Sequence, residues 1–146
     1  AVMLLATECD GLSDFEQACR DVETGRIGSG VTIVISDFFF KQGYESALRQ
    51  LIGARYDLYV IQILSPQEIS PELAGDLKLL DIEDADAAEI TVSSALIKYY
   101  KRNLAAYCDE LRNFCTNRGA VYVQANSADS VETLVLNYLR RIQLLR

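Results

Sequence analysis

Two short apolar runs with a helical pattern between them constrain this chain most. Residues 31–35 and 56–64 are rich in β-branched and aromatic side chains, which is typical of strands buried inside a sheet. Residues 43–52 carry apolar side chains at helical spacing, and Gly53 follows where a helix would end. A strand, a helix and a second parallel strand form a right-handed βαβ unit. We therefore expect a parallel sheet in which the strand at 31–35 is covered on both faces.

The remaining sequence extends this pattern. A capping box of Ser13 and Glu16 predicts the start of a helix at 15–22, and the stretch 65–75, which holds both prolines, is expected to be a loop. The other predicted elements are a polar β-hairpin at 76–82 and 88–92, a long helix that is capped by Ser93 or Ser94 and ends at 117–119, a third buried strand at 120–125 and a last helix at 131–142. Together they predict one α/β domain over residues 1–146, with a mostly parallel sheet flanked by helices and a hairpin inserted at one edge.

Composition excludes several classes of function. The chain has 146 residues, half of them apolar, and 14 basic against 21 acidic residues give a net charge of −7. Nucleic acid is therefore not an expected partner, because phosphate binding needs a cationic face. The sequence has no apolar run long enough to span a membrane, so we expect no membrane contact in this segment. It also has no histidine, which is the commonest general base and zinc ligand.

The four cysteines, at positions 9, 19, 108 and 115, lack the C-x-x-C spacing of zinc and redox sites. We expect buried free thiols in a cytoplasmic protein. The first residues lack the basic and full-length apolar regions of a signal peptide, and position 1 is not a methionine. We therefore expect a fragment of a longer protein.

Oxygen-bearing side chains follow the predicted parallel strands, at the edge where such sheets bind ligands. Ser36 and Asp37 follow the first strand. The later strand ends deliver Ser65, Glu68, Asn126 and Ser127. Oxygen donors of this kind suit Mg²⁺. Asp37 taken alone is better explained as the cap of a helix or turn that follows a strand.

Three further features each have a structural and a functional interpretation. Phe38, Phe39 and Phe40 cannot all point into one core, so we expect at least one to be exposed or to cover a loop. A role in the core is the favoured interpretation of this run, and a contact point for a partner is the alternative. The acidic residues between 81 and 89 lack the spacing of a calcium-binding loop and are expected to form a solvated hairpin turn. A small basic patch on the long helix is expected to be its solvated face; it consists of Lys98, Lys101 and Arg102.

Several segments taken together resemble one protein family. The sequence VISDFF at 34–39 is followed by GYESALR at 43–49, by VIQILSPQE at 60–68 and by LRR at 139–141. From about residue 11 to the C-terminus, the chain resembles a bacterial family of undefined function with a von Willebrand factor A-like domain, of the type associated with MoxR ATPases. The resemblance implies that the chain is the C-terminal portion of such a domain, with an incomplete Rossmann-like sheet.

The resemblance also implies a metal-ion-dependent adhesion site that is built from three loops and holds Mg²⁺. Asp37 matches the aspartate of the third loop, with Ser36 before it, and Ser13 stands where the second loop carries a threonine. The Asp-x-Ser-x-Ser motif of the first loop is absent from the chain. In the family's fold, the strand bearing that motif lies beside the strand at 31–35. Its absence implies an unpaired edge, which residues 2–6, a second copy of the chain or a missing N-terminal piece would fill.

We therefore expect a binding and assembly module and not an enzyme. Ser13, Ser36 and Asp37 would hold Mg²⁺. The missing loop and a carboxylate of a protein partner would complete the coordination of the ion. The partner that the resemblance suggests is a MoxR-type AAA+ ATPase. Two alternatives stay open. One is a Mg²⁺-dependent hydrolase that uses the same strand ends, and the other is a metal-free protein-interaction domain that uses residues 38–40 and the acidic hairpin.

Overall fold

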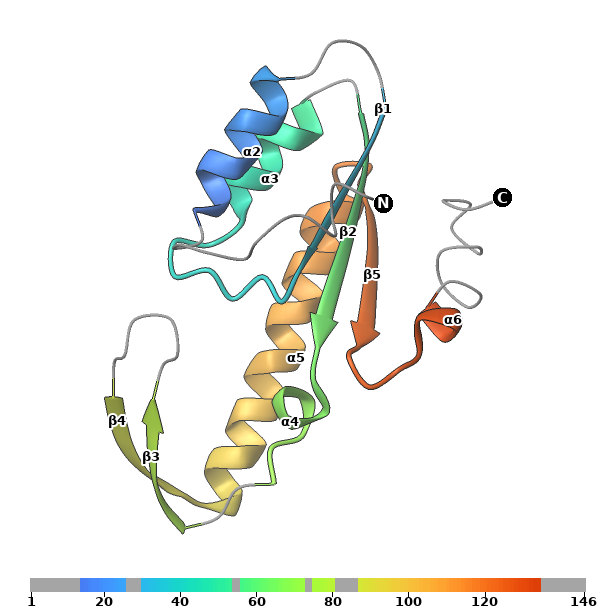
Figure 1. Cartoon of the computed structure of the whole chain (residues 1–146). Coiled ribbons are helices and arrows are strands. Elements are labelled where there is room, and N and C mark those ends of the chain that lie inside the picture. Colours follow the sequence, from blue (N-terminus) through green and yellow to red (C-terminus); the bar gives the residue numbers. More distant parts are fainter. Residues whose placement is uncertain (1–13, 26–29, 54–55, 73–74, 81–86, 135–146) are drawn as a thin grey trace, which may run out of the picture.

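The computed structural model describes residues 14–25, 30–53, 56–72, 75–80 and 87–134. In chain order they form α2 (Phe15–Thr24), β1 (Gly30–Ser36), α3 (Glu45–Gly53), β2 (Tyr56–Leu64), α4 (Pro66–Ile69), β3 (Gly75–Leu80), β4 (Ala87–Val92), α5 (Ser94–Thr116), β5 (Val121–Asn126) and α6 (Val131–Leu134) (Figure 1). Ser13, Cys9, the acidic turn at 81–86 and most of the predicted last helix lie outside the described residues.

The central feature is a three-stranded parallel sheet in the order β1-β2-β5. Ile33 of β1 pairs with Tyr59 of β2, and Ile61 of β2 pairs with Val123 of β5. Because α3 connects β1 to β2, the predicted βαβ arrangement of two parallel strands and a helix is confirmed, and with it the α/β class. The carboxyl ends of the three strands meet at one edge of the sheet (Figure 1).

β3 and β4 form the predicted antiparallel hairpin, in which Gly75 pairs with Val92. The hairpin is a separate two-stranded sheet and does not extend the main one. The chain passes through α4 after β2, and this carries it past the carboxyl end of the main sheet before β3 begins (Figure 1). The hairpin therefore lies at the same end of the molecule as the first half of α5 (Figure 1).

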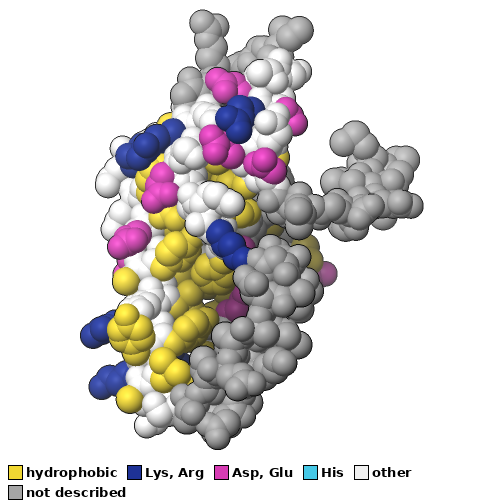
Figure 2. All heavy atoms as spheres, turned by 90° about the vertical axis from the view of Figure 1, so that its left-hand side faces the viewer, with side chains coloured by type: hydrophobic (Ala, Val, Ile, Leu, Met, Phe, Trp, Pro, Cys, Tyr) yellow, Lys and Arg dark blue, Asp and Glu magenta, His cyan; other side chains and the backbone are white. Residues whose placement is uncertain are grey.

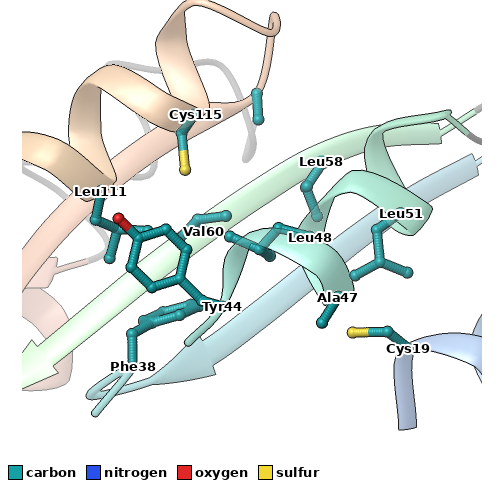
Figure 3. Packing of buried hydrophobic residues seen from close by; sticks show 11 residues of the cluster. Cys19, Phe38, Tyr44, Ala47, Leu48, Leu51, Leu58, Val60, Leu111 and Cys115 are labelled. Atoms are coloured by element: carbon teal, nitrogen blue, oxygen red, sulfur yellow. The ribbon is translucent and has the colours of Figure 1, made fainter. Parts of the chain in front are cut away.

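The hydrophobic core lies between one face of the sheet and the helices α2, α3 and α5 (Figure 3). Side chains alternate along a strand, so Leu58 and Val60 of β2 both point to this face. They pack with residues from all three helices, namely Cys19, Ala47, Leu48, Leu51, Leu111 and Cys115. Each fully buried aliphatic side chain of this kind contributes about 1.5–3 kcal/mol to folding.

The opposite face of β1 is exposed, and the prediction that β1 is covered on both faces is wrong. The side chains of Ile33 and Ile35 are 47% and 61% exposed, whereas the neighbouring Thr32 is buried. The physical reason is that α2, α3 and α5 all pack against the same side of the sheet. A strand rich in apolar residues therefore presents most of them, namely Val31, Ile33 and Ile35, at the surface.

Two helix starts differ from the sequence prediction. The N-cap of α2 is Asp14 and not Ser13: the Asp14 carboxylate accepts a hydrogen bond of 2.9 Å from the backbone N–H of Gln17. An aspartate at this position satisfies a backbone donor that a helix leaves unpaired. The stretch expected to be a loop contains the short helix α4, because Ser65 and Glu68 form a reciprocal capping box with Pro66 in the first turn.

The long helix α5 follows the sequence prediction. Ser93 is its N-cap, with its hydroxyl accepting from the backbone N–H of Leu96 at 3.2 Å. Beyond the helix, Gly119 has a φ of +80°, which only glycine adopts without strain.

In the described part of the chain, no helix combines the length and the apolar character that crossing a bilayer requires. The described cysteines are buried and free, as predicted: Cys19, Cys108 and Cys115.

Candidate functional site at the carboxyl end of β1

Ser36 and Asp37 form a tight turn directly after β1. The hydroxyl of Ser36 accepts a hydrogen bond of 3.0 Å from the backbone N–H of Phe38. Oδ1 of Asp37 accepts one of 3.0 Å from the N–H of Phe39, and the Ser36 hydroxyl donates to the same oxygen at 3.4 Å. Side-chain oxygens that bond to the backbone two residues later are the usual stabilisers of such turns. Asp37 thus caps the turn, and its carboxylate is exposed to solvent.

Side chains of β2, β5 and α5 support the turn through hydrogen bonds. The amide nitrogen of Gln62 donates to the backbone carbonyl of Asp37 at 2.9 Å. The amide oxygen of Gln62 accepts from the hydroxyl of Tyr122 at 2.6 Å. The hydroxyl of Tyr107 donates to the backbone carbonyl of Phe38. Because Gln62 is fully buried, its bonds form in a medium where an unpaired amide would be costly.

Phe38 has an unusual backbone conformation. Its φ of +67° lies in the left-handed region, which costs a residue with a side chain about 1–2 kcal/mol. Its ring is fully buried and makes edge-to-face contacts with Phe15, Phe40 and Tyr44, with ring centroids 6.0, 6.1 and 6.3 Å away. This burial and the carbonyl bond from Tyr107 offset the strain.

The strained turn separates the three consecutive phenylalanines. Phe38 is buried, and Phe40 stacks on Phe15 with centroids 4.3 Å apart. Phe39 points outward and is 43% exposed, with its ring 5.7 Å from that of Tyr107. The prediction that at least one of the three is exposed is confirmed. Phe39 is therefore presented on a rigid support, next to the exposed carboxylate of Asp37.

Burial raises the pKa of the two supporting tyrosines. For Tyr107, burial is the main cause, and the negative charges of Glu45 and Asp37 add to it. Burial is also the main cause for Tyr122. Both hydroxyls therefore keep their protons at any physiological pH and act as permanent hydrogen-bond donors to the site.

A groove of about 440 Å³ runs between α2 and β1. Phe15 and Cys19 lie on its helix side, while residues 32–36 of β1 form its other side. The groove reaches Ser36 at the carboxyl end of β1 and Asp14 at the start of α2. The sequence predicted that Ser13 and Asp37 lie at the same end of the sheet. Ser13 itself is outside the described residues, but its neighbour Asp14 lines the same groove as Ser36.

Ser65, Glu68 and Asn126 bond within their own turns, and Ser127 bonds to the end of β2. Glu68 accepts from the backbone of Ser65 at 2.6 Å and Ser65 accepts from that of Glu68 at 3.1 Å. The side chain of Asn126 accepts from the N–H of Ala128 at 2.9 Å, and the N–H of Ser127 bonds to the carbonyl of Leu64. Among the residues that the structure describes, no three histidine, cysteine or acidic side chains converge as metal ligands. Of the described candidates for the metal site, Ser36 and Asp37 meet in the turn after β1.

The supporting residues were missed by the sequence analysis. Gln62, Tyr107 and Tyr122 lie 25 to 69 residues from their partners in the sequence, so no local spacing reveals them. One signal was available: Gln62 interrupts an otherwise apolar run at 60–64. A polar side chain in the middle of a buried strand needs a hydrogen-bond partner, and here one partner is the Asp37 turn.

Comparison with known proteins shows which family the chain belongs to. No solved structure matches the chain. Over 78 residues it is 31% identical to "Uncharacterized protein Mb1516" of Mycobacterium bovis and "Uncharacterized protein Rv1480" of Mycobacterium tuberculosis, a match that covers 53% of this chain and 24% of each relative. The chain therefore spans about a quarter of the length of these relatives. Residues 3–124 match the family model described as "Protein of unknown function DUF58", and the chain belongs to this family.

Proposed function

We propose that this chain is part of a metal-dependent protein-binding and assembly module with a von Willebrand factor A-like architecture. The observation that carries the proposal is the position of Asp37: its exposed carboxylate directly follows β1, the end strand of the described sheet, beside a groove. Mg²⁺ would be held there by Ser36, Asp37 and Ser13 together with oxygen ligands from a segment outside this chain. A carboxylate from the bound partner would complete the coordination.

The side-chain oxygens at this site are the type of ligand that Mg²⁺ prefers. Mg²⁺ takes oxygen ligands and keeps several waters, and both Ser36 and Asp37 offer oxygen. The hydrogen bonds of the Asp37 carboxylate involve Oδ1, so the group as a whole keeps lone pairs that face solvent. Two described donors are too few for tight binding. We therefore expect this chain by itself to bind Mg²⁺ more weakly than about 1 mM.

The groove offers an added strand a place to bind. A strand added alongside residues 33–36 of β1 would lie between the exposed side chains of Ile33 and Ile35 on one face and the α2 side of the groove on the other. Exposed apolar strand edges readily recruit another strand. Such a strand would reach the carboxyl end of the sheet next to Asp37. It can come from the rest of a longer polypeptide, or from a second copy of the chain in a homodimer.

The proposed partner is a MoxR-type AAA+ ATPase, and the proposed location is the cytoplasm. The support is the membership in the DUF58 family. In this proposal the module binds and does not catalyse. The partner would contribute a carboxylate to the ion and an apolar group to Phe39, which lies on the same turn.

Magnesium titration followed by ¹H–¹⁵N NMR tests the proposal. We expect shifts confined to the turn at 36–39, with a midpoint above about 1 mM, and their loss in Asp37→Ala. Asp57→Ala is the matched control, because Asp57 is an exposed carboxylate near the amino end of β2. Micromolar affinity that survives Asp37→Ala, or shifts that Asp57→Ala removes instead, would contradict the assignment of Asp37 as a ligand.

A metal-free interaction domain is the second candidate, and the exposure of Phe39 favours it. An exposed aromatic ring on a rigid turn can anchor a partner without an ion. Binding to a MoxR-type ATPase, measured with and without EDTA, separates the two candidates. Loss of binding in EDTA and in Asp37→Ala supports the metal-dependent module. Binding that is unchanged in EDTA but lost in Phe39→Ala supports the metal-free one.

A further inference from the structure

The first half of α5 has little support from the rest of the fold. None of the described side chains at 94–107 is buried, whereas Cys108, Leu111 and Cys115 in the second half are all in the core. Figure 1 shows the reason: the first half extends past the carboxyl ends of the strands, beside α4 and at the same end of the molecule as the hairpin. Isolated helices of this length are marginal in water, because most helical stability comes from packing of one face. Ile97, Leu104 and Tyr107 are half-buried, and the exposed apolar surface on the rest of this half-helix is a candidate for binding a partner.

The charge on this half-helix is opposite to that of the chain. Residues 94–108 contain three cations and no acidic residue, in a chain of net charge −7. Lys101 donates to the hydroxyl of Ser70 at 2.8 Å. Lys98 and Arg102 are exposed and stand four residues apart, a spacing at which like charges repel on a helix. Cations near a helix N-terminus also oppose the helix dipole. This arrangement of cations does not stabilise the helix, but it would attract an anionic group.

Apolar side chains accompany these two cations. Tyr99 is 55% exposed and Leu96 is 38% exposed. The guanidinium carbon of Arg102 lies 5.3 Å from the centre of the Tyr99 ring, so the ring holds the cation in place. In Figure 2, Lys and Arg side chains lie beside hydrophobic ones in the lower left part of the face, while acidic side chains gather mainly in the upper half. We define the α5 patch as Leu96, Lys98, Tyr99 and Arg102.

We propose that the α5 patch is a docking surface for an acidic peptide segment of a protein partner, separate from the Asp37 turn. Carboxylates of the segment would pair with Lys98 and Arg102, where the planar guanidinium can bind a carboxylate with two parallel hydrogen bonds. An aromatic or aliphatic side chain between the carboxylates would pack on Tyr99 and Leu96. Exposed alanines at 95, 105 and 106 let the partner's backbone approach closely. A nucleic acid fits less well, because a dense polyanion is repelled by the net charge of −7.

Fluorescence anisotropy with a synthetic peptide tests this proposal. The probe is a short labelled peptide in which glutamates flank one phenylalanine and one leucine. We expect the full chain to bind it, and Lys98→Glu/Arg102→Glu to weaken binding at least about tenfold. A peptide with glutamine in place of glutamate, and one with alanine in place of the two apolar residues, should each bind more weakly. EDTA should have no effect, which keeps this result independent of the metal site at Asp37.

Arg20→Glu/Arg49→Glu is the matched control. It changes the net charge by the same amount, on the exposed surfaces of α2 and α3, and should bind the peptide almost as well as the unmodified chain. Circular dichroism verifies that both double variants remain folded. An equal loss in the two double variants would overturn the proposal, because it would show an effect of net charge alone. A lack of peptide binding by the unmodified chain would also overturn it. So would tighter binding of a single-stranded DNA oligonucleotide, or self-association that the Lys98→Glu/Arg102→Glu change abolishes.

Discussion

The hydroxyl of Tyr107 donates a hydrogen bond to the backbone carbonyl of Phe38, a residue with a φ of +67°. The bond joins the middle of α5 to the turn after β1, across 69 residues of sequence. A left-handed backbone conformation in a residue other than glycine persists only where surrounding contacts hold it. Tyr107 therefore helps to fix the direction in which Asp37 and Phe39 point. The candidate site depends on α5 as well as on the strand that it follows.

Removing the Tyr107 hydroxyl should loosen this turn. We expect Tyr107→Phe to lower the free energy of unfolding by about 1 kcal/mol, because it deletes one hydrogen bond and leaves the ring in place. Hydrogen exchange of the Phe39 amide should become faster, since the turn relaxes around Phe38. Denaturant titration and exchange NMR measure the two effects. Tyr99→Phe, on the exposed surface of the same helix, should change neither; unaltered exchange at Phe39 in Tyr107→Phe would contradict the role given to this bond.

Gln62 should be sensitive even to a substitution that keeps its size. Gln62→Met removes the partners of the Asp37 carbonyl and of the Tyr122 hydroxyl, and we expect a cost of about 1–3 kcal/mol. Adding Tyr122→Phe should recover part of this loss, because it removes the hydroxyl left without a partner. A double-mutant cycle by urea unfolding measures the coupling. Strictly additive effects would show that the two side chains do not act as one network.

The buried thiols predict a loss of stability in alkaline solution. Burial raises the pKa of Cys19 and Cys115 from 9.0 to about 11, with the charge of Glu16 adding to the effect at Cys19. Between about pH 9 and pH 11 the unfolded chain therefore loses these protons while the folded chain keeps them, and the free energy of unfolding falls as the pH rises. Below about pH 9 these thiols add no pH dependence. Urea midpoints measured across this range should fall less steeply in Cys115→Ala than in the unmodified chain; an identical slope would refute the linkage.

The two faces of the sheet should respond very differently to substitution. Leu48→Ala empties a fully buried position and should cost about 2–5 kcal/mol. Ile35→Thr alters a side chain that is 61% exposed and should change stability by less than about 0.5 kcal/mol. Thermal and denaturant unfolding compare the two. A large loss in Ile35→Thr would mean that the outer face of β1 is covered in solution by another part of the protein.

Local sequence patterns predicted the elements well where one pattern dominates. The apolar runs identified β1 and β2, and the spacing of apolar residues together with a capping serine identified α5. The same reasoning failed where two signals compete. The prolines of the stretch 65–75 suggested a loop, but the capping box of Ser65 and Glu68 prevails, and α4 forms. At the start of α2, Asp14 caps the helix, although Ser13 with Glu16 three residues later also has the pattern of a capping box.

Burial and tertiary contacts were harder to predict than the elements. The apolar run at 31–35 predicts a strand, but it does not reveal how many helices pack on each face of the sheet. In the structure α2, α3 and α5 share one face, so Ile33 and Ile35 are exposed. For the candidate site, the chain order was sufficient to place Ser36 and Asp37 at a strand end. The support from Gln62 and Tyr107 depends on long-range packing, which no short spacing encodes.

The uneven support of α5 has a consequence for how the protein unfolds. Its second half is anchored by Leu111 and Cys115, while nothing in its first half is buried. Local opening of a helix requires less free energy where few buried contacts are lost. On heating, we expect the first half to fray well before the core melts, so that helical circular dichroism begins to fall before the near-ultraviolet signal of the packed aromatic rings. One continuous helix would then behave as two cooperative units, with the boundary near Tyr107.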